Sequence, residues 1–205
     1  MRYAMAIDLR RCVGCDTCSI ACKMSNNLPK DMLWLKVHTQ GGEAKDTAAG
    51  TFPNVTMSYL PMNCMHCTNA PCVAACPTKA TTQREDGIVV IDQELCIGCG
   101  KCIEACPYEG IRTLNEGEPE FYLDFELGHP TAPKHVANVV EKCNFCVGRL
   151  ELGEKPACME LCPGRARYFG DIDDPNSEIS KLIASREVMR LQEENGAQPN
   201  VYYLV

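Results

Sequence analysis

Short stretches of alternating apolar and polar residues are the clearest pattern along this chain. Residues 34–40 and 55–60 (VTMSYL) alternate as half-buried strands do, and residues 87–92 (GIVVID) predict a third short strand. Residues 177–194 repeat apolar positions at helical spacing, which predicts an amphipathic helix with Ser177 as its N-cap. The chain therefore mixes short strands with short helices.

Two further stretches are less regular. Residues 107–142 form a long connection with Gly, Pro and Glu, which predicts a surface insertion and a candidate docking element. The last residues, 201–205, are apolar. They fit an edge strand or a partner contact, and fit a strand on the chain's own core at least as well.

Composition bounds the class of protein. Of 205 residues, 45% are hydrophobic and 23% charged, as in soluble globular proteins. The net charge of −7 argues against a nucleic-acid-binding surface. No apolar run reaches the length of a membrane span, and the first residues hold no apolar secretory segment. The Arg10–Arg11 pair runs directly into cysteines, so it predicts no cleavable signal.

The sixteen cysteines change this ordinary picture. A chain of this length builds a core without disulfide staples, so the cysteines call for a chemical explanation. They fall into four quartets with none left over. Quartet one is Cys12, Cys15, Cys18 and Cys22; quartet two is Cys64, Cys67, Cys72 and Cys76; quartet three is Cys96, Cys99, Cys102 and Cys106; quartet four is Cys143, Cys146, Cys158 and Cys162.

Quartets one and three have the spacing C-x2-C-x2-C-x3-C, the ligand run of bacterial ferredoxins. Gly14 and Gly98 fall where the loop must turn tightly. In that run the fourth cysteine ligates a second cluster, and we expect it at the start of a helix. Pro follows it in quartets two, three and four, as suits a first helical turn, whereas quartet one has Lys23.

The spacing favours four [4Fe–4S] clusters over the two alternatives, structural zinc and disulfides. Zinc sites pair two C-x2-C knuckles and rarely add the third and fourth cysteines seen here. C-x2-C loops have poor disulfide geometry. Residues 12–22 match 96–106, and residues 70–77 (APCVAACP) match 156–163 (PACMELCP), which indicates two related halves.

A cluster with four cysteine ligands has no open iron site, so its task is one-electron transfer. The chain has no G-x-G-x-x-G fingerprint, free thiol or Ser-His-Asp pattern, and we predict no catalytic residue. His66 is expected to pack near a cluster, with a hydrogen bond to cluster sulfur as the alternative. Lys101 and Lys142 either place positive charge near clusters or are solvated. The remaining histidines, His38, His129 and His135, are assigned no role.

The four quartets, in this order, resemble the four-cluster iron–sulfur subunit of the dimethyl-sulfoxide-reductase family of molybdopterin enzymes. The segments IDLRRCVGC, CSIACKMSNN and CPGRARYFGDIDDPNS are similar to the polysulfide- and arsenate-reductase branch. The resemblance covers nearly the whole chain and is weakest at residues 110–140.

The resemblance implies an α+β fold of two nested ferredoxin-like units. The outer unit takes residues 1–26 and 130–175 and the inner unit 55–110, with insertions at 27–54 and 107–142 and a C-terminal helix and tail at 176–205. Its ligand sets would be Cys12, Cys15, Cys18 and Cys162; Cys143, Cys146, Cys158 and Cys22; Cys64, Cys67, Cys72 and Cys106; and Cys96, Cys99, Cys102 and Cys76. Some relatives lose a cysteine of quartet three and hold a three-iron cluster; Cys102 is present here.

The resemblance also implies partners. The protein would relay electrons between a molybdenum or tungsten bis-pterin catalytic subunit and a quinone-linked membrane subunit or a soluble redox partner. A partner's signal would carry it if the complex is exported, and a cytoplasmic complex fits equally well. The alternatives are a stand-alone polyferredoxin and a subunit of a formate dehydrogenase or hydrogenase.

Overall fold

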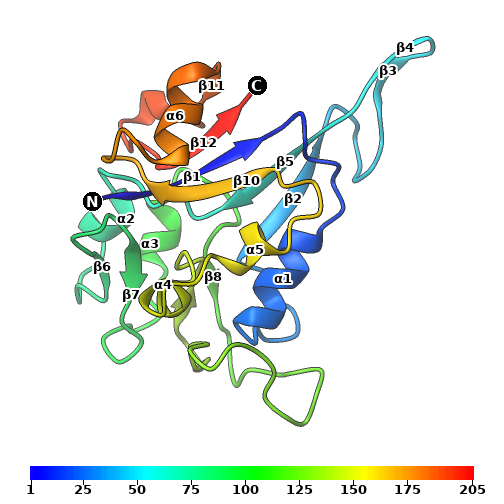
Figure 1. The fold of residues 1–205 in the computed structure, drawn as a ribbon. Helices are drawn as coiled ribbons and strands as arrows, with labels where there is room; N and C mark the ends of the chain where they lie inside the picture. The colour runs from blue at the N-terminus through cyan, green and yellow to red at the C-terminus, as the bar shows by residue number, and fades with distance from the viewer.

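The computed structural model describes residues 1–205 and centres on a four-stranded sheet in the order β10–β1–β12–β11 (Figure 1). Strand β1 (Tyr3–Asp8) runs antiparallel to β10 (Arg167–Asp171) and parallel to β12 (Val201–Leu204), and β11 (Val188–Met189) pairs with β12. The first and last segments of the chain are therefore neighbours inside one sheet. Residues 201–205 confirm the own-core interpretation, since Val201, Tyr203 and Leu204 are fully buried.

The two faces of this sheet pack against different layers, as the two-residue period of a strand dictates. Ala4 and Ala6 of β1 pack with Ile179 of helix α6 (Glu178–Ser185). Met5 and Ile7, which alternate with them, face the large core that holds many of the cysteines. The sheet thus separates α6 from the cysteine-rich body.

Smaller two-stranded pairs build that body. Strand β2 (Leu35–Gln40) pairs with β5 (Ser58–Asn63), and β6 (Thr81–Gln83) pairs with β7 (Val89–Ile91). The predicted strands at 34–40 and 87–92 are confirmed. The predicted strand at 55–60 is wrong in part, because the chain breaks at Met57 between β4 (Asn54–Thr56) and β5. Strand β4 pairs with β3 (Ala49–Thr51) in a hairpin that projects from the body (Figure 1).

The connection at 107–142 is only partly a surface insertion. Its ends pair as β8 (Thr113–Leu114), which is half-buried, and β9 (Val140–Glu141), which is buried, and Tyr108 and Ile111 lie in the core. Its middle is largely exposed, including Phe121, Tyr122, Leu123 and Phe125. An insertion can be recognised from composition, whereas the burial of its ends depends on residues far away in sequence.

The helix predicted at 177–194 begins as expected and ends early. Ser177 caps α6, since its Oγ accepts a hydrogen bond from the Ser180 N–H at 3.2 Å. The helix ends at Ser185, Arg186 turns to an extended conformation, and its guanidinium binds the buried carboxylate of Asp8. Val188 and Met189 then pair with β12, so strand pairing overrides the helical pattern. A 3₁₀ turn, η1 (Glu193–Asn195), follows.

The remaining helices are short, and each contains or directly follows a cysteine. They are α1 (Thr17–Ser25), α2 (Pro71–Ala74), α3 (Lys101–Glu104), α4 (Val147–Glu151) and α5 (Ala157–Glu160). Helix α1 packs against α5, and α2 packs against α3. None of the helices has the length and apolar character that a bilayer span requires.

The central sheet generates a stability prediction. Tyr203 is fully buried on the cysteine-facing side of β12, and its hydroxyl donates to the Pro61 carbonyl at 3.0 Å. Tyr203→Ala should lower the free energy of unfolding by about 3–5 kcal/mol, because it leaves a large cavity. Tyr202→Ala, on the half-buried opposite face, should cost clearly less. Denaturant titration followed by circular dichroism measures both, and equal losses would contradict this orientation of β12.

Candidate metal centres

Two of the cysteine loops turn through glycines in the left-handed region. Gly14 has φ +69° and Gly98 has φ +66°, as the C-x2-C spacing predicts. A Cβ at Gly98 would lie 2.4 Å from the Asn138 carbonyl oxygen. The loop of quartet three is therefore packed closely against the far end of the 107–142 connection.

The predicted position of the fourth cysteines is wrong. Cys76, Cys106 and Cys162 do not begin helices but follow the ends of α2, α3 and α5. The reason is the proline after each one, which disfavours helical conformation in the residue before it. Quartet one lacks that proline, and there α1 continues through Cys22 to Ser25.

Three cysteines of quartet one share a cavity with the last cysteine of quartet four. Cys12, Cys15, Cys18 and Cys162 all line it, together with Arg167. The Ala166 N–H donates to Cys162 Sγ at 3.3 Å, a contact that favours the thiolate. The structure thus brings together residues from opposite ends of the chain.

Cys22 lies among the first three cysteines of quartet four. Burial raises the pKa of its thiol well above the usual range, and Cys143, Cys146 and Cys158 raise it further. Helix packing explains the juxtaposition, because Cys22 is on α1 and Cys158 is on α5.

A third set of neighbouring cysteines combines residues of quartets two and three. Burial raises the pKa of Cys67 to about 12, and its neighbours Cys64, Cys72 and Cys106 contribute to the rise. The other cysteines of these quartets are brought together by α2 and α3, which pack against each other. Cys76 follows the end of α2, and Cys102 lies on α3. Cys96 packs against the buried cluster that contains Cys72 and Cys102, and the Thr81 N–H donates to Cys76 Sγ at 3.4 Å.

The chemistry of these donors fits iron–sulfur clusters. A buried thiolate is disfavoured unless positive charge is close, and a metal core supplies it and deprotonates the thiol. No group of three or more His, Cys, Asp or Glu side chains is close enough together to hold a single metal ion. Thiolates on a cubane bind four different irons, so they lie further apart than ligands that converge on one zinc.

Sequence reasoning missed two buried arginines beside the cysteines. Arg112 and Arg167 are 5% and 3% exposed. Arg112 Nη2 donates to Cys72 Sγ at 2.8 Å, and Arg167 Nη1 lies 3.9 Å from Cys158 Sγ. The available signal was an arginine directly after an apolar residue, five or six residues beyond the cysteine of a Cys-Pro pair.

The pKa directions of these arginines follow from the same surroundings. Burial lowers the pKa of Arg112, but Cys64, Cys72, Cys102 and Cys106 raise it by more. Burial likewise lowers the pKa of Arg167, and Cys158, Cys18, Tyr203 and Cys143 raise it by more. Both guanidinium groups therefore stay charged in the core.

The two lysines considered from the sequence have different surroundings. Lys142 is buried, and its Nζ donates to the carbonyls of Val89 and Cys143. Burial is the main cause that lowers its pKa. Lys101 is exposed at the start of α3, as in the solvated alternative.

His66 packs in the core as expected. Its ring stacks on Phe145 with centroids 3.7 Å apart, and its Nδ1 accepts from the Val89 N–H at 3.0 Å. Burial holds its pKa well below the usual value, so the ring is neutral with its proton on Nε2. The Nε2–H is buried and has no hydrogen-bond partner in the protein. It is therefore the free donor that a hydrogen bond from His66 to cluster sulfur would require.

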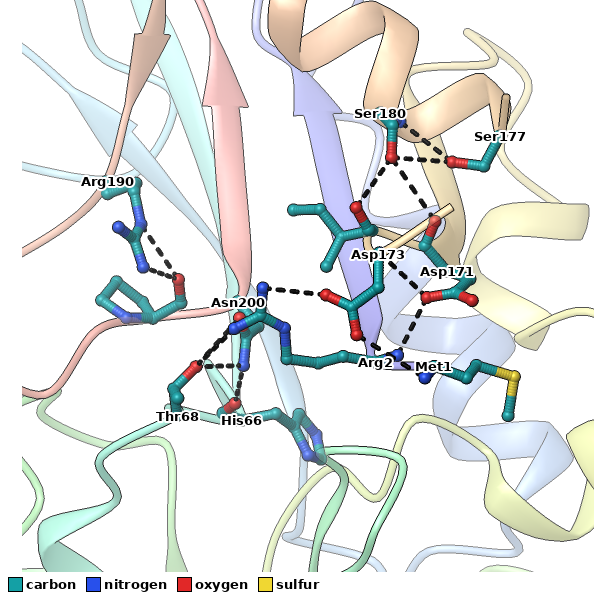
Figure 2. A network of polar contacts seen from close by, with 12 residues as sticks. Met1, Arg2, His66, Thr68, Asp171, Asp173, Ser177, Ser180, Arg190 and Asn200 are labelled. Atoms are coloured by element: carbon teal, nitrogen blue, oxygen red, sulfur yellow. Dashed lines mark hydrogen bonds and ion pairs between the residues drawn. The ribbon is translucent and has the colours of Figure 1, made fainter. Parts of the chain in front are cut away.

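The loop that carries His66 is tied to both ends of the chain (Figure 2). The Asn200 side-chain amide donates to the His66 carbonyl at 2.7 Å and to Thr68 Oγ1 at 3.2 Å. Arg2 reaches the same Thr68 hydroxyl and forms an ion pair with Asp173. The first two cysteines of quartet two are thus held against the start of β12 and the N-terminus.

Of the three histidines without an assigned role, the two that are partly buried form polar contacts within the protein. His135 is hydrogen-bonded to Glu141 Oε2 at 2.7 Å and to the Asn26 carbonyl at 2.9 Å. His129 pairs with Glu154, and His38 is exposed on β2.

Comparison with known families and proteins gives consistent matches. One 4Fe-4S dicluster domain matches residues 55–119 and 131–172, more than half of the chain, and a second matches residues 11–80. A Halobacterium salinarum protein, proposed to be the iron-sulfur subunit of a dimethyl sulfoxide reductase, is 45% identical over 98% of this chain and 78% of its own length.

Two further relatives are 42% identical. One is a selenate reductase subunit of Mesobacillus selenatarsenatis, matched over 100% of this chain and 72% of its own length. The other is a tetrathionate reductase subunit of Salmonella typhimurium, matched over 99% and 72%. Two dicluster domains correspond to four [4Fe–4S] clusters, and sixteen cysteines match that number.

The glycine geometry generates a prediction about iron content. Gly98→Ala and Gly100→Ala both place a side chain at positive φ, at a cost of about 1–2 kcal/mol. Only the first also drives a Cβ into a backbone carbonyl, since nothing lies within 4 Å of a Cβ at Gly100. Iron analysis after anaerobic purification should show a loss of up to about four irons in Gly98→Ala and none in Gly100→Ala. Equal iron in both variants would show that this contact does not matter.

Proposed function

Because this chain belongs to the family of iron–sulfur electron-transfer subunits of dimethyl-sulfoxide-reductase-type molybdopterin enzymes, we propose that it relays electrons between a molybdopterin catalytic subunit and a second redox partner. It is a non-catalytic subunit of a reductase complex. The single observation that carries this function is the set of sixteen cysteines in four complete quartets. Four cysteine ligands close each cluster, so a bound cluster supplies one-electron transfer.

We propose four ligand groups, each with the fourth cysteine of a distant or neighbouring quartet. Group I is Cys12, Cys15, Cys18 and Cys162; group II is Cys22, Cys143, Cys146 and Cys158; group III is Cys64, Cys67, Cys72 and Cys106; group IV is Cys76, Cys96, Cys99 and Cys102. The shared cavity supports group I, and the cysteines that raise the pKa of Cys22 and of Cys67 support groups II and III. Packing of α2 on α3 supports group IV. These groups correspond to two nested ferredoxin-like units.

The groups follow one another as a row in the order I, II, III, IV. Arg167 lines the group I cavity and reaches Cys158 of group II. Cys64 of group III raises the pKa of Cys143 of group II. Cys72 and Cys102, from groups III and IV, lie in one buried cluster. Electron transfer requires short steps between centres, and these links between successive groups support the proposed order.

The two ends of the row are the places for partners. Cys15 in group I and Cys99 in group IV are the two exposed cysteines. Each loop also presents an exposed apolar side chain, Val13 at 65% and Ile97 at 64%. Apolar residues beside a redox centre suit close docking. We assign one end to the catalytic subunit and the other to a quinone-linked membrane subunit or a soluble partner. The substrate is selected in the catalytic chain.

One prediction of this function concerns the metal content of the protein and the chains that co-purify with it. The anaerobically purified protein should be brown and carry about sixteen irons. When it is isolated from its native source through a tag, a molybdenum- or tungsten-containing chain should accompany it. Purification of the fully loaded protein alone, without such a chain, favours the polyferredoxin alternative. About eight irons in intact protein would contradict four clusters.

The second prediction tests the ligand groups without prior assignment of signals. Cys162→Ser should perturb the same electron paramagnetic resonance signal as Cys12→Ser, because both remove a ligand from group I. Cys158→Ser, only four residues away in sequence, should perturb a different signal, that of group II. If Cys162→Ser and Cys158→Ser alter one common signal and Cys12→Ser another, the groups are wrong.

A further inference from the structure

Three buried cations lie beside the cysteine groups, and the electron-transfer assignment gives none of them a role in balancing cluster charge. They are Arg167, Lys142 and Arg112, each 5% exposed or less. We propose that each is a junction cation, shared by two adjacent clusters: Arg167 by I and II, Lys142 by II and III, and Arg112 by III and IV. This inference rests on the proposed ligand groups and concerns how their charges are balanced.

Arg167 bridges the first junction by direct geometry. Its side chain lines the cavity that Cys12, Cys15, Cys18 and Cys162 share, and its Nη1 lies 3.9 Å from Cys158 Sγ of group II. The other partners of Nη1 are Met5 Sδ and Asn63 Oδ1, so no carboxylate neutralises it. Its buried Nη2 has no partner in the protein, which leaves a charged donor free for a cluster.

Arg112 repeats this arrangement at the last junction. Its Nη2 donates to Cys72 Sγ of group III at 2.8 Å, while Nε and Nη1 are buried without partners. Cys102 of group IV is among the thiols that raise its pKa, and Cys72 and Cys102 share one buried cluster. No ion pair with Asp or Glu is formed. A buried guanidinium without a carboxylate is costly unless other negative charge is near.

Lys142 occupies the middle junction. It precedes Cys143 of group II, and Val89, whose carbonyl accepts from its Nζ, is buried in one cluster with Cys72 of group III. Its Nζ is held by the carbonyls of Val89 and Cys143, and Val89 also holds the His66 ring. One cation therefore stands at each of the three junctions.

The expected effect follows from charge. Each cluster with four thiolates is about 2−, so neighbours repel, and repulsion is strong where water is excluded. A cation between two clusters stabilises the reduced state of both. Its removal should make the potentials of both neighbours more negative while leaving distant clusters nearly unchanged.

The test is a redox titration of the intact complex, followed by electron paramagnetic resonance, for Arg167→Met, Lys142→Met and Arg112→Met. Each variant should shift two of the four midpoint potentials, with roughly a tenfold change in the reduction equilibrium, or about 59 mV for one electron. The pairs shifted by Arg167→Met and Arg112→Met should have no cluster in common. The pair shifted by Lys142→Met should share one cluster with each.

Arg165→Gln is the matched control, because Arg165 is exposed although it lies closer in sequence to Cys162. It should shift no potential. The proposal is overturned if the Arg167 and Arg112 pairs overlap, if only one cluster responds to each change, or if Arg165→Gln has the same effect. Those outcomes leave the relay function intact as long as iron content and co-purification are unchanged.

A measurement on the unaltered protein tests the proposal even where the variants do not assemble. With arginine labelled by ¹⁵N in the guanidinium group, pulsed electron paramagnetic resonance should detect ¹⁵N couplings to the reduced clusters. Arg167 lines the group I cavity and lies 3.9 Å from Cys158 of group II, and Arg112 donates to Cys72 of group III, which shares a buried cluster with Cys102 of group IV. Couplings are therefore expected on every cluster that can be reduced. No guanidinium coupling on any reduced cluster would overturn the role of both arginines.

Discussion

The constraint on which the rest of this structure depends is the burial of negative charge. Four clusters with sixteen thiolates add about −8 to a chain that already carries −7. Burial is the largest cause that raises the pKa of thiols such as Cys22 and Cys158, so the protein by itself opposes the thiolate state at these buried positions. The opposing contributions come from the iron cores, from backbone N–H groups such as those of Ala166 and Thr81, and from the buried side chains of Arg112 and Arg167.

The fold serves this constraint by closing the chain on itself. Strand β12 lies between β1 and β11, so the two chain ends share a sheet whose inner face, through Met5 and Tyr203, covers the cysteine core. The Cys-Pro pairs end their helices and release the fourth cysteines into turns. The chain then enters a strand soon afterwards. Arg112 precedes β8 and Arg167 begins β10, and each guanidinium points back toward the thiols.

Local signals in the sequence predicted what is decided locally. Cysteine spacing identified the loops, Gly14 and Gly98 marked their turns, and Ser177 marked a helix start. What could not be predicted depends on distant partners. The pairing of Val188 with β12 ended a helix that periodicity would have extended, and distant packing buried both ends of the 107–142 connection. The arginines were missed because arginine is usually a surface residue, and only the tertiary structure shows that cysteines surround it.

The internal repeat sharpens the meaning of those arginines. Alignment of quartet four on quartet two places Arg167 at the position of Thr81, five residues after the fourth cysteine. Alignment of quartet three on quartet one places Arg112 at the position of Leu28, six residues after it. All four positions are buried, yet only one member of each pair is charged. A purely structural arginine would be expected in both halves of a repeat, since both halves face the same packing problem. Under the proposed ligand groups the two halves nest and both contribute to each junction between clusters, so one cation per pair is enough.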